Sequence, residues 1–468
     1  MIPLRLDEIA RATGGRLVGG ADPDRAVDGP VVLDSRAAVA GSLFVAVAGE
    51  HVDGHDFAPA AVEAGAVAYL GTRDAGVAGI LVADAAIALG ALANAVLRRL
   101  PATRVVGVTG SAGKTSTKDL LGAVFATGGP TVAPAGNLNN EYGLPLTVTT
   151  ARPDTETIVL EYGARGVGHI RYLTTIAPPH IGVVLNVGTA HLGEFGSREM
   201  VAQAKGELVE ALPIDGAAIL NADDPLVSAM AGRTRASVVT YGLAQTADVR
   251  LRELTTDEAA RARFVVSTPG GTASVALSLH GAHHAHNAAA AIAAGLAAGL
   301  DFDPMVGALE AATARSPHRM DVRVRADGIV VIDDAYNASP DSMLAGLNAL
   351  MRMKTNGRRW AVLGTMRELG DESEVAHRDI GEQAVRLGVD RLVVVGSDAA
   401  AIASGASGAS GASGASGAPL GGAAVTSVDG AEAAAELLAA ELGDGDVVLI
   451  KASNSERLWR VADRLVDA

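Results

Sequence analysis

The stretch GVTGSAGKTSTKD, residues 107–119, constrains the fold of this chain more than any other. It continues the apolar run RVVGV (104–108) and carries Gly-Lys-Thr at the start of a segment, 115–125, that we expect to be helical. A buried strand, a glycine-rich turn and a helix in this order are typical of phosphate-binding corners in α/β proteins. The ordinary P-loop, G-x-x-x-x-G-K-[ST], needs a glycine at position 108, where this chain has valine. The loop matches the shorter pattern T-G-x-x-G-K-T instead.

The residue types of this loop suit a nucleotide phosphate. Backbone N–H groups of a glycine-rich turn can approach phosphate oxygens, the positive end of the following helix points at them, and Lys114 adds a mobile cation. The hydroxyl of Thr115 is then placed to bind Mg²⁺. A plain strand-turn-helix corner is the alternative, and Gly-Lys-Thr-Ser at the mouth of a helix argues against it.

Two series of apolar segments predict parallel sheets. The first series adds TIVLEYG (157–163), IGVVLNVG (181–188) and GAAILNADD (216–224) to the strand before the loop. The second series is GIVVIDDAYN (328–337), RWAVLGTM (359–366), DRLVVVGSD (390–398) and GDVVLIKAS (445–453). Strands that are apolar throughout and separated by helical segments indicate a parallel sheet covered on both faces. We therefore predict an α/β fold with ligands at the carboxyl ends of the strands, where the polar residues fall.

The length of 468 residues suggests about three domains. We place a small α/β domain at 1–100, a central domain at 101–312 and a C-terminal domain at 313–468. Five consecutive Ala-Ser-Gly triplets fill 403–417. Because such a composition cannot bury a core, we expect a flexible surface insertion there, and a recognition segment is the alternative.

Composition excludes several classes of function. The chain has 38 basic and 53 acidic residues, a net charge of −15, which argues against a nucleic-acid partner. It has no cysteine, so disulfides and thiolate metal sites are excluded. Its first residues, MIPLRLDEIARATGG, carry acids early and have no apolar run long enough for a signal peptide or a membrane helix. We expect a cytoplasmic protein without membrane insertion.

Polar residues of four further segments are candidates for a site. Glu161 ends an apolar strand and needs a partner, either a basic side chain or Mg²⁺, and its place directly after the loop's strand in the series favours the metal. His191 follows the next strand and Lys205 lies in an amphipathic helix, and alone each fits an ordinary packed or solvated role. The loop GNLNNEYGLP (136–145) is rich in side-chain amides suited to sugar or peptide groups, or it is a turn cluster.

Taken together, the motifs resemble the Mur ligases. TGSAGKTS, GNLNNEYGLP, EYGARGVGHI, NVGTAHLGEFGS, QAKGEL, DDAYNASPDSM and MRELG occur in this order, and the resemblance runs from residue 34 to residue 453. It implies an N-terminal domain for a UDP-sugar, a central ATP-binding domain with a parallel sheet flanked by helices, and a Rossmann-like C-terminal domain that closes over the nucleotide. The family's short phosphate loop, T-G-x-x-G-K-[ST], matches residues 109–115.

The resemblance also implies roles for single residues. The catalytic set would be Lys114, Glu161, His191 and Lys205, and Mg²⁺ would be held by Thr115, Glu161, His191 and Lys205, with Lys205 as a carbamate. The residues implied to bind ATP are Thr109, Gly110, Ser111, Ala112, Gly113, Lys114, Thr115, Ser116, Asn287, Arg319 and Asp334. The residues implied to bind the other substrates are Asp34, Ser35 and Arg36 at the uridine diphosphate end, and Asn137, Asn139, Asn140, Tyr336 and Asn337 near the peptide.

The reaction implied is ATP-dependent peptide-bond formation through an acyl phosphate. MRELG and the asparagine loop favour the branch of the family that adds D-alanyl-D-alanine to a UDP-N-acetylmuramoyl-tripeptide for peptidoglycan synthesis, and we expect a monomer. The alternatives are a tripeptide synthetase that adds a diamino acid, whose usual D-N-P-R motif is absent, a folylpolyglutamate synthase, and a nucleotide-binding regulator without ligase activity. The sequence departs from the family's pattern at His284, His318, Thr365 and the KASN segment, 451–454.

Overall fold

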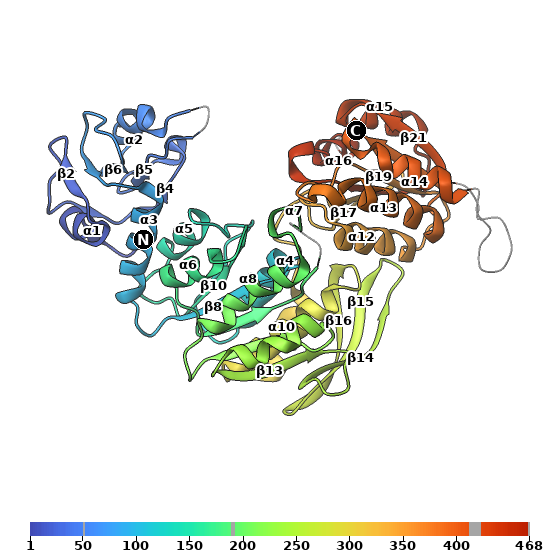
Figure 1. The fold of residues 1–468 in the computed structure, drawn as a ribbon, viewed down its shortest axis with the longest axis horizontal. Helices are drawn as coiled ribbons and strands as arrows, with labels where there is room; N and C mark the ends of the chain where they lie inside the picture. The colour runs from blue at the N-terminus through green and yellow to red at the C-terminus, as the bar shows by residue number, and fades with distance from the viewer. Residues whose placement is uncertain (50–51, 189–191, 411–422, 467–468) are drawn as a thin grey trace.

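The structure is a computed structural model that describes residues 1–49, 52–188, 192–410 and 423–466. Its described strands form three main sheets in succession along the chain, within residues 16–81, 104–280 and 321–451. Figure 1 shows the same order as three lobes, coloured from blue through green and yellow to red. No helix of the described ranges is long and apolar enough to cross a bilayer.

The first lobe is a small sheet with helices around it. Its described strands run in the order β2 (Arg16–Val18), β7 (Gly79–Leu81), β6 (Ala68–Gly71), β5 (Leu43–Val45) and β4 (Val31–Val32), and only β2 is antiparallel to its neighbour. A separate pair joins β1 (Leu4–Arg5) to β3 (Ala26–Val27). The helices are α1 (Leu6–Thr13), α2 (Ala58–Glu63) and α3 (Ala85–Arg98), with short 3-10 turns at Ser35–Ala37 and Gly54–Phe57.

The central lobe contains the strand before the phosphate loop in the middle of its sheet. The order of the described strands is β16 (Gly271–His280), β15 (Arg261–Thr268), β14 (Val249–Thr256), β13 (Ser237–Gly242), β12 (Ala217–Asn221), β11 (Ile181–Val184), β8 (Arg104–Thr109), β10 (Thr157–Glu161) and β9 (Thr131–Val132). The helices are α4 (Lys114–Phe125), α5 (Gly143–Thr149), α6 (His169–Ile176), α7 (Leu192–Phe195), α8 (Arg198–Glu210), α9 (Pro225–Ser228), α10 (His284–Ala297) and α11 (Phe302–Ala311), with a 3-10 turn at Ala229–Arg233.

The four strands predicted for the central sheet are confirmed, but the sheet is not parallel throughout. From β9 to β14 neighbouring strands are parallel, whereas β14, β15 and β16 form antiparallel pairs that the sequence analysis missed. Their side chains alternate between buried and exposed, as in β16, because this end of the sheet is covered on one face by α10 and α11. A search for continuous apolar runs does not find such strands.

The third lobe has the four predicted strands and two more. The order of the described strands is β17 (Asp321–Val324), β18 (Val330–Asp333), β22 (Val447–Lys451), β19 (Arg359–Leu363), β20 (Arg391–Val395) and β21 (Ala424–Val428), all parallel except β17. The helices are α12 (Pro340–Arg352), α13 (Ser373–Leu387), α14 (Ala400–Ser410), α15 (Ala431–Glu441) and α16 (Trp459–Val466), with 3-10 turns at Gly370–Glu372, Ser397–Ala399 and Asn454–Glu456.

The prediction of a flexible insertion at 403–417 is wrong for the first half of this segment. Residues 403–410 belong to helix α14, and Ala406 and Ala409 are buried in the core. The small residues allow α13 and α14 to pack closely: a Cβ at Gly405 would stand 2.0 Å from the carbonyl oxygen of Arg378. The Ala-Ser-Gly composition can therefore bury surface here, because a neighbouring helix accepts it. The remainder, 411–417, lies outside the described residues.

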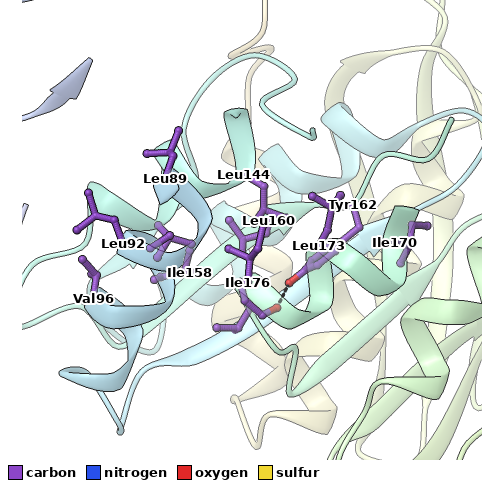
Figure 2. Close-up of a cluster of buried hydrophobic side chains, with 14 of the residues drawn as sticks. Leu89, Leu92, Val96, Leu144, Ile158, Leu160, Tyr162, Ile170, Leu173 and Ile176 are labelled. Atoms are coloured by element: carbon purple, nitrogen blue, oxygen red, sulfur yellow. Dashed lines mark hydrogen bonds between the residues drawn. The ribbon is translucent and has the colours of Figure 1, made fainter. Parts of the chain in front are cut away.

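The first and central lobes share one hydrophobic core. Helix α3 packs against α5 and α6, and Figure 2 shows Leu89, Leu92 and Val96 in one buried cluster with Ile158 and Ile176. At the other end of the cluster the hydroxyl of Tyr162 donates to the backbone carbonyl of Ala177, drawn as a dashed line in Figure 2. This core holds the strand that ends at Glu161 in place.

Candidate active site

The phosphate loop lies at the carboxyl edge of the central sheet, as predicted. Strand β8 ends at Thr109, and α4 begins at Lys114 after Gly113, whose φ of 83° is in the left-handed region that favours glycine. The loop is anchored to the strand beside it. The amide of Ser111 donates to the carbonyl oxygen of Asn186 at 3.1 Å and that of Ala112 to the Asn186 side chain at 2.9 Å. The sequence analysis did not single out Asn186, although it lies in LNVG directly after the apolar run of β11.

Two cavities lined by described residues meet at this loop. The first cavity, of about 310 Å³, and the second cavity, of about 280 Å³, share Ser111, Ala112, Gly113, Arg319 and Asn337. The other predicted residues in the first cavity are Ser116, Asn287 and Asp334. Those in the second cavity are Lys114, Thr115, Asn137, Asn139, Asn140, Glu161, Lys205 and Tyr336. Most of the residues inferred for ATP and peptide are thus brought together from the central and third lobes.

The second cavity is lined by buried charged groups. Glu161 is 2% exposed, and its Oε2 accepts a long hydrogen bond of 3.4 Å from the side-chain amide of Asn139. Burial lowers the pKa of the Lys114 ammonium, against the opposing charge of Glu161, and its Nζ donates to the carbonyl oxygen of Gly110 at 2.7 Å. Burial, with the nearby charge of Lys114, holds the pKa of Lys205 well below its usual range.

The donor set suits Mg²⁺ only in part. Oε1 of Glu161 is buried and has no hydrogen-bond partner, so it can accept a hard cation. Thr115 lines the same cavity, whereas Lys205 can bind a metal only as an anion such as a carbamate. His191 lies outside the described residues. Within the described part of the chain, no group of three or more His, Cys, Asp or Glu side chains is placed to hold a metal.

The asparagine loop is bound into the site by its side chains. Asn137 accepts a hydrogen bond from the hydroxyl of Tyr336, which comes from the third lobe. Asn140 caps helix α5, because its Oδ1 accepts from the amides of Tyr142 at 3.2 Å and Gly143 at 2.8 Å. Asn140 thus holds a turn, as one interpretation of this loop predicts. Asn137 and Asn139 line the second cavity and connect it to the third lobe and to the buried acid, while substrate binding by the loop stays a prediction.

The third lobe supplies the outer wall of both cavities. The guanidinium of Arg319 lies 4.3 Å from the ring centre of Tyr336. Asp334 forms an ion pair of 2.6 Å with Lys451, whose Nζ also donates to the carbonyl oxygen of Asn337 at 2.9 Å. Lys451 is thus engaged in holding the turn after β18. Asn287, from α10, reaches the loop itself, since a Cβ at Gly113 would stand 3.1 Å from its Oδ1.

One of the departures noted in the sequence has a structural explanation. His318 has a φ of 60°, in the left-handed region where the family's usual glycine is free of strain. Its Nδ1 lies 2.6 Å from Asp333 and its ring stacks on Trp459 at 5.3 Å, contacts that offset the strain. His284 lines the first cavity beside Asn287, with its ring 4.2 Å from that of His283. Nothing in the structure explains Thr365.

The uridine-side residues are not part of this site. Asp34, Ser35 and Arg36 lie in the first lobe and line neither cavity. Asp34 binds Arg36 at 2.6 Å, and hydrogen bonds from that residue lower the pKa of the Asp34 carboxyl to about 2. Among the titratable side chains that line the second cavity, three were not singled out from the sequence, Arg165, His169 and Glu368. The first two follow Glu161 in EYGARGVGHI, a motif used only for the family resemblance.

Comparison with known proteins agrees with this geometry. Family models match residues 30–108 (Mur ligase family, catalytic domain), 108–295 (Mur ligase middle domain) and 318–454 (Mur ligase, glutamate ligase domain). A relative from Mycobacterium tuberculosis named UDP-N-acetylmuramoyl-tripeptide--D-alanyl-D-alanine ligase is 46% identical, over 100% of this chain and 98% of its own. The chain belongs to the Mur ligase family.

Solved Mur ligases share the whole fold. A structure of UDP-N-acetylmuramoylalanyl-D-glutamyl-2,6-diaminopimelate--D-alanyl-D-alanyl ligase from Acinetobacter baumannii has a TM-score of 0.84 at 29% identity, over 100% of this chain and 99% of that one. The MurF ligase of Thermotoga maritima, solved in complex with ADP, has a TM-score of 0.79 at 30% identity, covering 94% and 98%. A three-domain α/β Mur ligase fold, predicted from the motifs, is thereby confirmed for this chain.

Proposed function

We propose that this protein is an ATP-dependent ligase that joins D-alanyl-D-alanine to a UDP-N-acetylmuramoyl-tripeptide in peptidoglycan synthesis. One observation carries the proposal beyond family membership: the second cavity connects the phosphate loop to the asparagine loop across buried Glu161 and Lys205. A carboxylate held by the asparagine loop can there approach a phosphate held by Lys114. Relatives and solved structures that are named as ligases of this kind match the whole chain.

The chemistry has two steps. The terminal carboxylate of the tripeptide attacks the γ-phosphorus of ATP, which gives an acyl phosphate and ADP. The amine of D-alanyl-D-alanine then attacks the acyl carbon, phosphate leaves, and a proton is released. The first step brings two anions together, and Lys114 with the positive end of α4 offsets their repulsion. The third lobe contributes side chains to the lining of both cavities, and its closure over the nucleotide would exclude water from the acyl phosphate.

We propose Mg²⁺ as the cofactor, held by Thr115, Glu161, His191 and a modified Lys205. When bound, it would neutralise phosphate charge that the protein's own cations leave uncompensated. The orphaned Oε1 of Glu161 supports this assignment. The lowered pKa of Lys205 supports a carbamate, because the neutral amine attacks CO₂, a C–N bond forms, and one proton is released. His191 remains a prediction from the resemblance.

Each lobe then has its own task. We assign binding of the UDP end of the substrate to residues 1–100, through Asp34, Ser35 and Arg36. We assign binding of ATP and of the reacting carboxylate to residues 101–312. Closure over the nucleotide is assigned to residues 313–468, through Arg319, Asp334, Tyr336 and Asn337. Thr109 lines neither cavity, and its hydroxyl donates to the carbonyl oxygen of Tyr162. We propose that the enzyme works in the cytoplasm, where ATP and UDP-linked precursors are available, as a monomer and without nucleic acid.

A phosphate-release assay tests the function. Purified protein with Mg·ATP and UDP-N-acetylmuramoyl-tripeptide should release phosphate only when D-alanyl-D-alanine is added, and mass spectrometry should find the pentapeptide. The tripeptide synthetase is tested with UDP-N-acetylmuramoyl-dipeptide as the precursor and diaminopimelate in place of D-alanyl-D-alanine. Equal phosphate release in that mixture would favour the tripeptide synthetase instead. ATP binding without turnover on any of these substrates would favour the regulator.

A further inference from the structure

The loop between β10 and α6, residues 162–168, is held at both ends by other elements. The amide of Gly163 donates to the carbonyl oxygen of Asn139 at 2.9 Å. The amide of Gly168 donates to the buried carboxylate of Glu207 at 2.6 Å. Between these points the amide of Arg165 donates to Nδ1 of His169 at 3.3 Å. The backbone at Arg165 is therefore fixed relative to the asparagine loop and to α8, the helix that carries Lys205.

The side chain of Arg165 is exposed, lines the second cavity, and makes no ion pair with any described residue. The charged side chains lining this cavity are four basic and two acidic: Lys114, Arg165, Lys205, Arg319, Glu161 and Glu368.

The other basic side chains of this cavity already have a position or a task. Lys114 lies on the phosphate loop, Lys205 is fully buried, and Arg319 stacks on Tyr336 and borders the first cavity as well. Arg165 is the remaining cation of the described lining, and it borders the second cavity alone. An arginine fixed in this way presents a planar fork suited to a carboxylate.

We propose that Arg165 binds a carboxylate of the UDP-tripeptide that does not react with ATP. The inference rests on the proposed function and specifies the substrate that the second cavity accepts. A tripeptide ending in D-glutamyl-2,6-diaminopimelate, as named for the Acinetobacter baumannii enzyme, has two such groups. One is the glutamyl carboxylate left free by the peptide bond, and the other is the second carboxylate of diaminopimelate. Either one gives Arg165 the anionic partner that it lacks among the described residues.

Binding of the UDP-tripeptide, measured by calorimetry on the full-length protein, tests the proposal without requiring turnover. Arg165→Gln should weaken the Kd by about tenfold, the effect of losing a charge-assisted hydrogen bond at a partly exposed site. Arg165→Lys should recover part of the loss. Arg235→Gln is the matched control, because Arg235 is also exposed and unpaired among the described residues, but lines neither cavity. Its Kd should equal that of the wild type.

Two analogues identify the carboxylate. If lysine in place of diaminopimelate abolishes the difference between the wild type and Arg165→Gln, the diaminopimelate carboxylate is bound. If D-isoglutamine in place of D-glutamate abolishes it, the glutamyl carboxylate is bound. An unchanged Kd in Arg165→Gln, a difference that neither analogue removes, or a rise confined to the KM for D-alanyl-D-alanine overturns the proposal. If the wild type releases no phosphate in the assay, the proposed function is refuted instead. The comparison of Kd values between the wild type and Arg165→Gln remains valid in that case.

Discussion

Replacement of Gly193 by alanine should interfere with closure of the third lobe over the active site. Gly193, in α7, lies against Gly370 of the MRELG segment, and its amide donates to the carbonyl oxygen of Glu368 at 3.2 Å. A Cβ at Gly193 would stand 2.6 Å from the nitrogen and 2.9 Å from the Cα of Gly370. Both are backbone atoms and cannot rotate away. The backbone of Gly193 is outside the left-handed region, so alanine strains only the contact between the lobes.

The expected size of the effect follows from this contact. Ordinary van der Waals contact begins near 3.4 Å, so the lobes must separate by roughly 0.8 Å locally, and overpacking of this kind costs about 1–3 kcal/mol. If that cost falls on the closed arrangement alone, its population and kcat/KM fall about 5–150-fold. The melting temperature should not change, since the substitution lies outside the hydrophobic cores.

Phosphate release, together with small-angle scattering, measures both consequences. With a non-hydrolysable ATP analogue and the UDP-tripeptide, the variant should remain more extended than the wild type. Gly232→Ala is the control, because a Cβ there meets nothing within 4 Å and the backbone is not left-handed. A kcat/KM within about twofold of the wild type would show that this contact does not belong to the catalytic arrangement.

Three further changes test single groups. Lys205→Ala should lower kcat by on the order of 10²–10³, and added bicarbonate should not restore it; near-normal turnover would contradict a catalytic role. Tyr162→Phe leaves the carbonyl of Ala177 without this hydrogen bond and should lower the free energy of unfolding by about 1–3 kcal/mol, measured by calorimetry. An unchanged free energy of unfolding would show that this hydrogen bond does not stabilise the fold. His377 accepts from the amide of Met366 at 2.9 Å, and burial lowers its pKa below 6.5. The free energy of unfolding should therefore fall as the pH drops from 6.5 toward the pKa of folded His377, by up to about 1.4 kcal/mol per pH unit. Urea unfolding followed by tryptophan fluorescence measures this fall, and His377→Gln should make it less steep.

The four strands predicted in each of the two large sheets could be found from the sequence because they are buried on both faces. A continuous apolar run followed by polar residues marks such a strand and its carboxyl end, as at Glu161. Register then explains why this acid faces the phosphate loop: Glu161 pairs with Val108, so the two strands end side by side. The antiparallel strands β14 to β16 have one exposed face and lack that signal.

Other features depend on contacts that no local pattern encodes. The helix α14 is stabilised by close approach to α13, which its Ala-Ser-Gly repeats alone do not predict. Asn186 resembles any asparagine after a strand, and only the folded chain shows that it anchors two residues of the phosphate loop. Arg165 likewise becomes informative only when its neighbours are known, because the significant fact is that no described acidic side chain pairs with it.

The asparagine loop and the third lobe are connected twice, and this has a mechanistic consequence. Asn137 accepts from Tyr336, while the amide of Gly136 donates to Ser316 at 3.1 Å, in the linker that leads to the third lobe. Ser316 in turn donates to Asp119 at 2.9 Å, and buried Lys118 donates to the carbonyl oxygen of Gly136 at 2.9 Å, both from α4. The helix that begins at the phosphate loop therefore holds the linker and the asparagine loop together. We therefore expect movement of the third lobe to shift the Asn137 contact, so that closure over ATP and shaping of the peptide side of the site occur as one event.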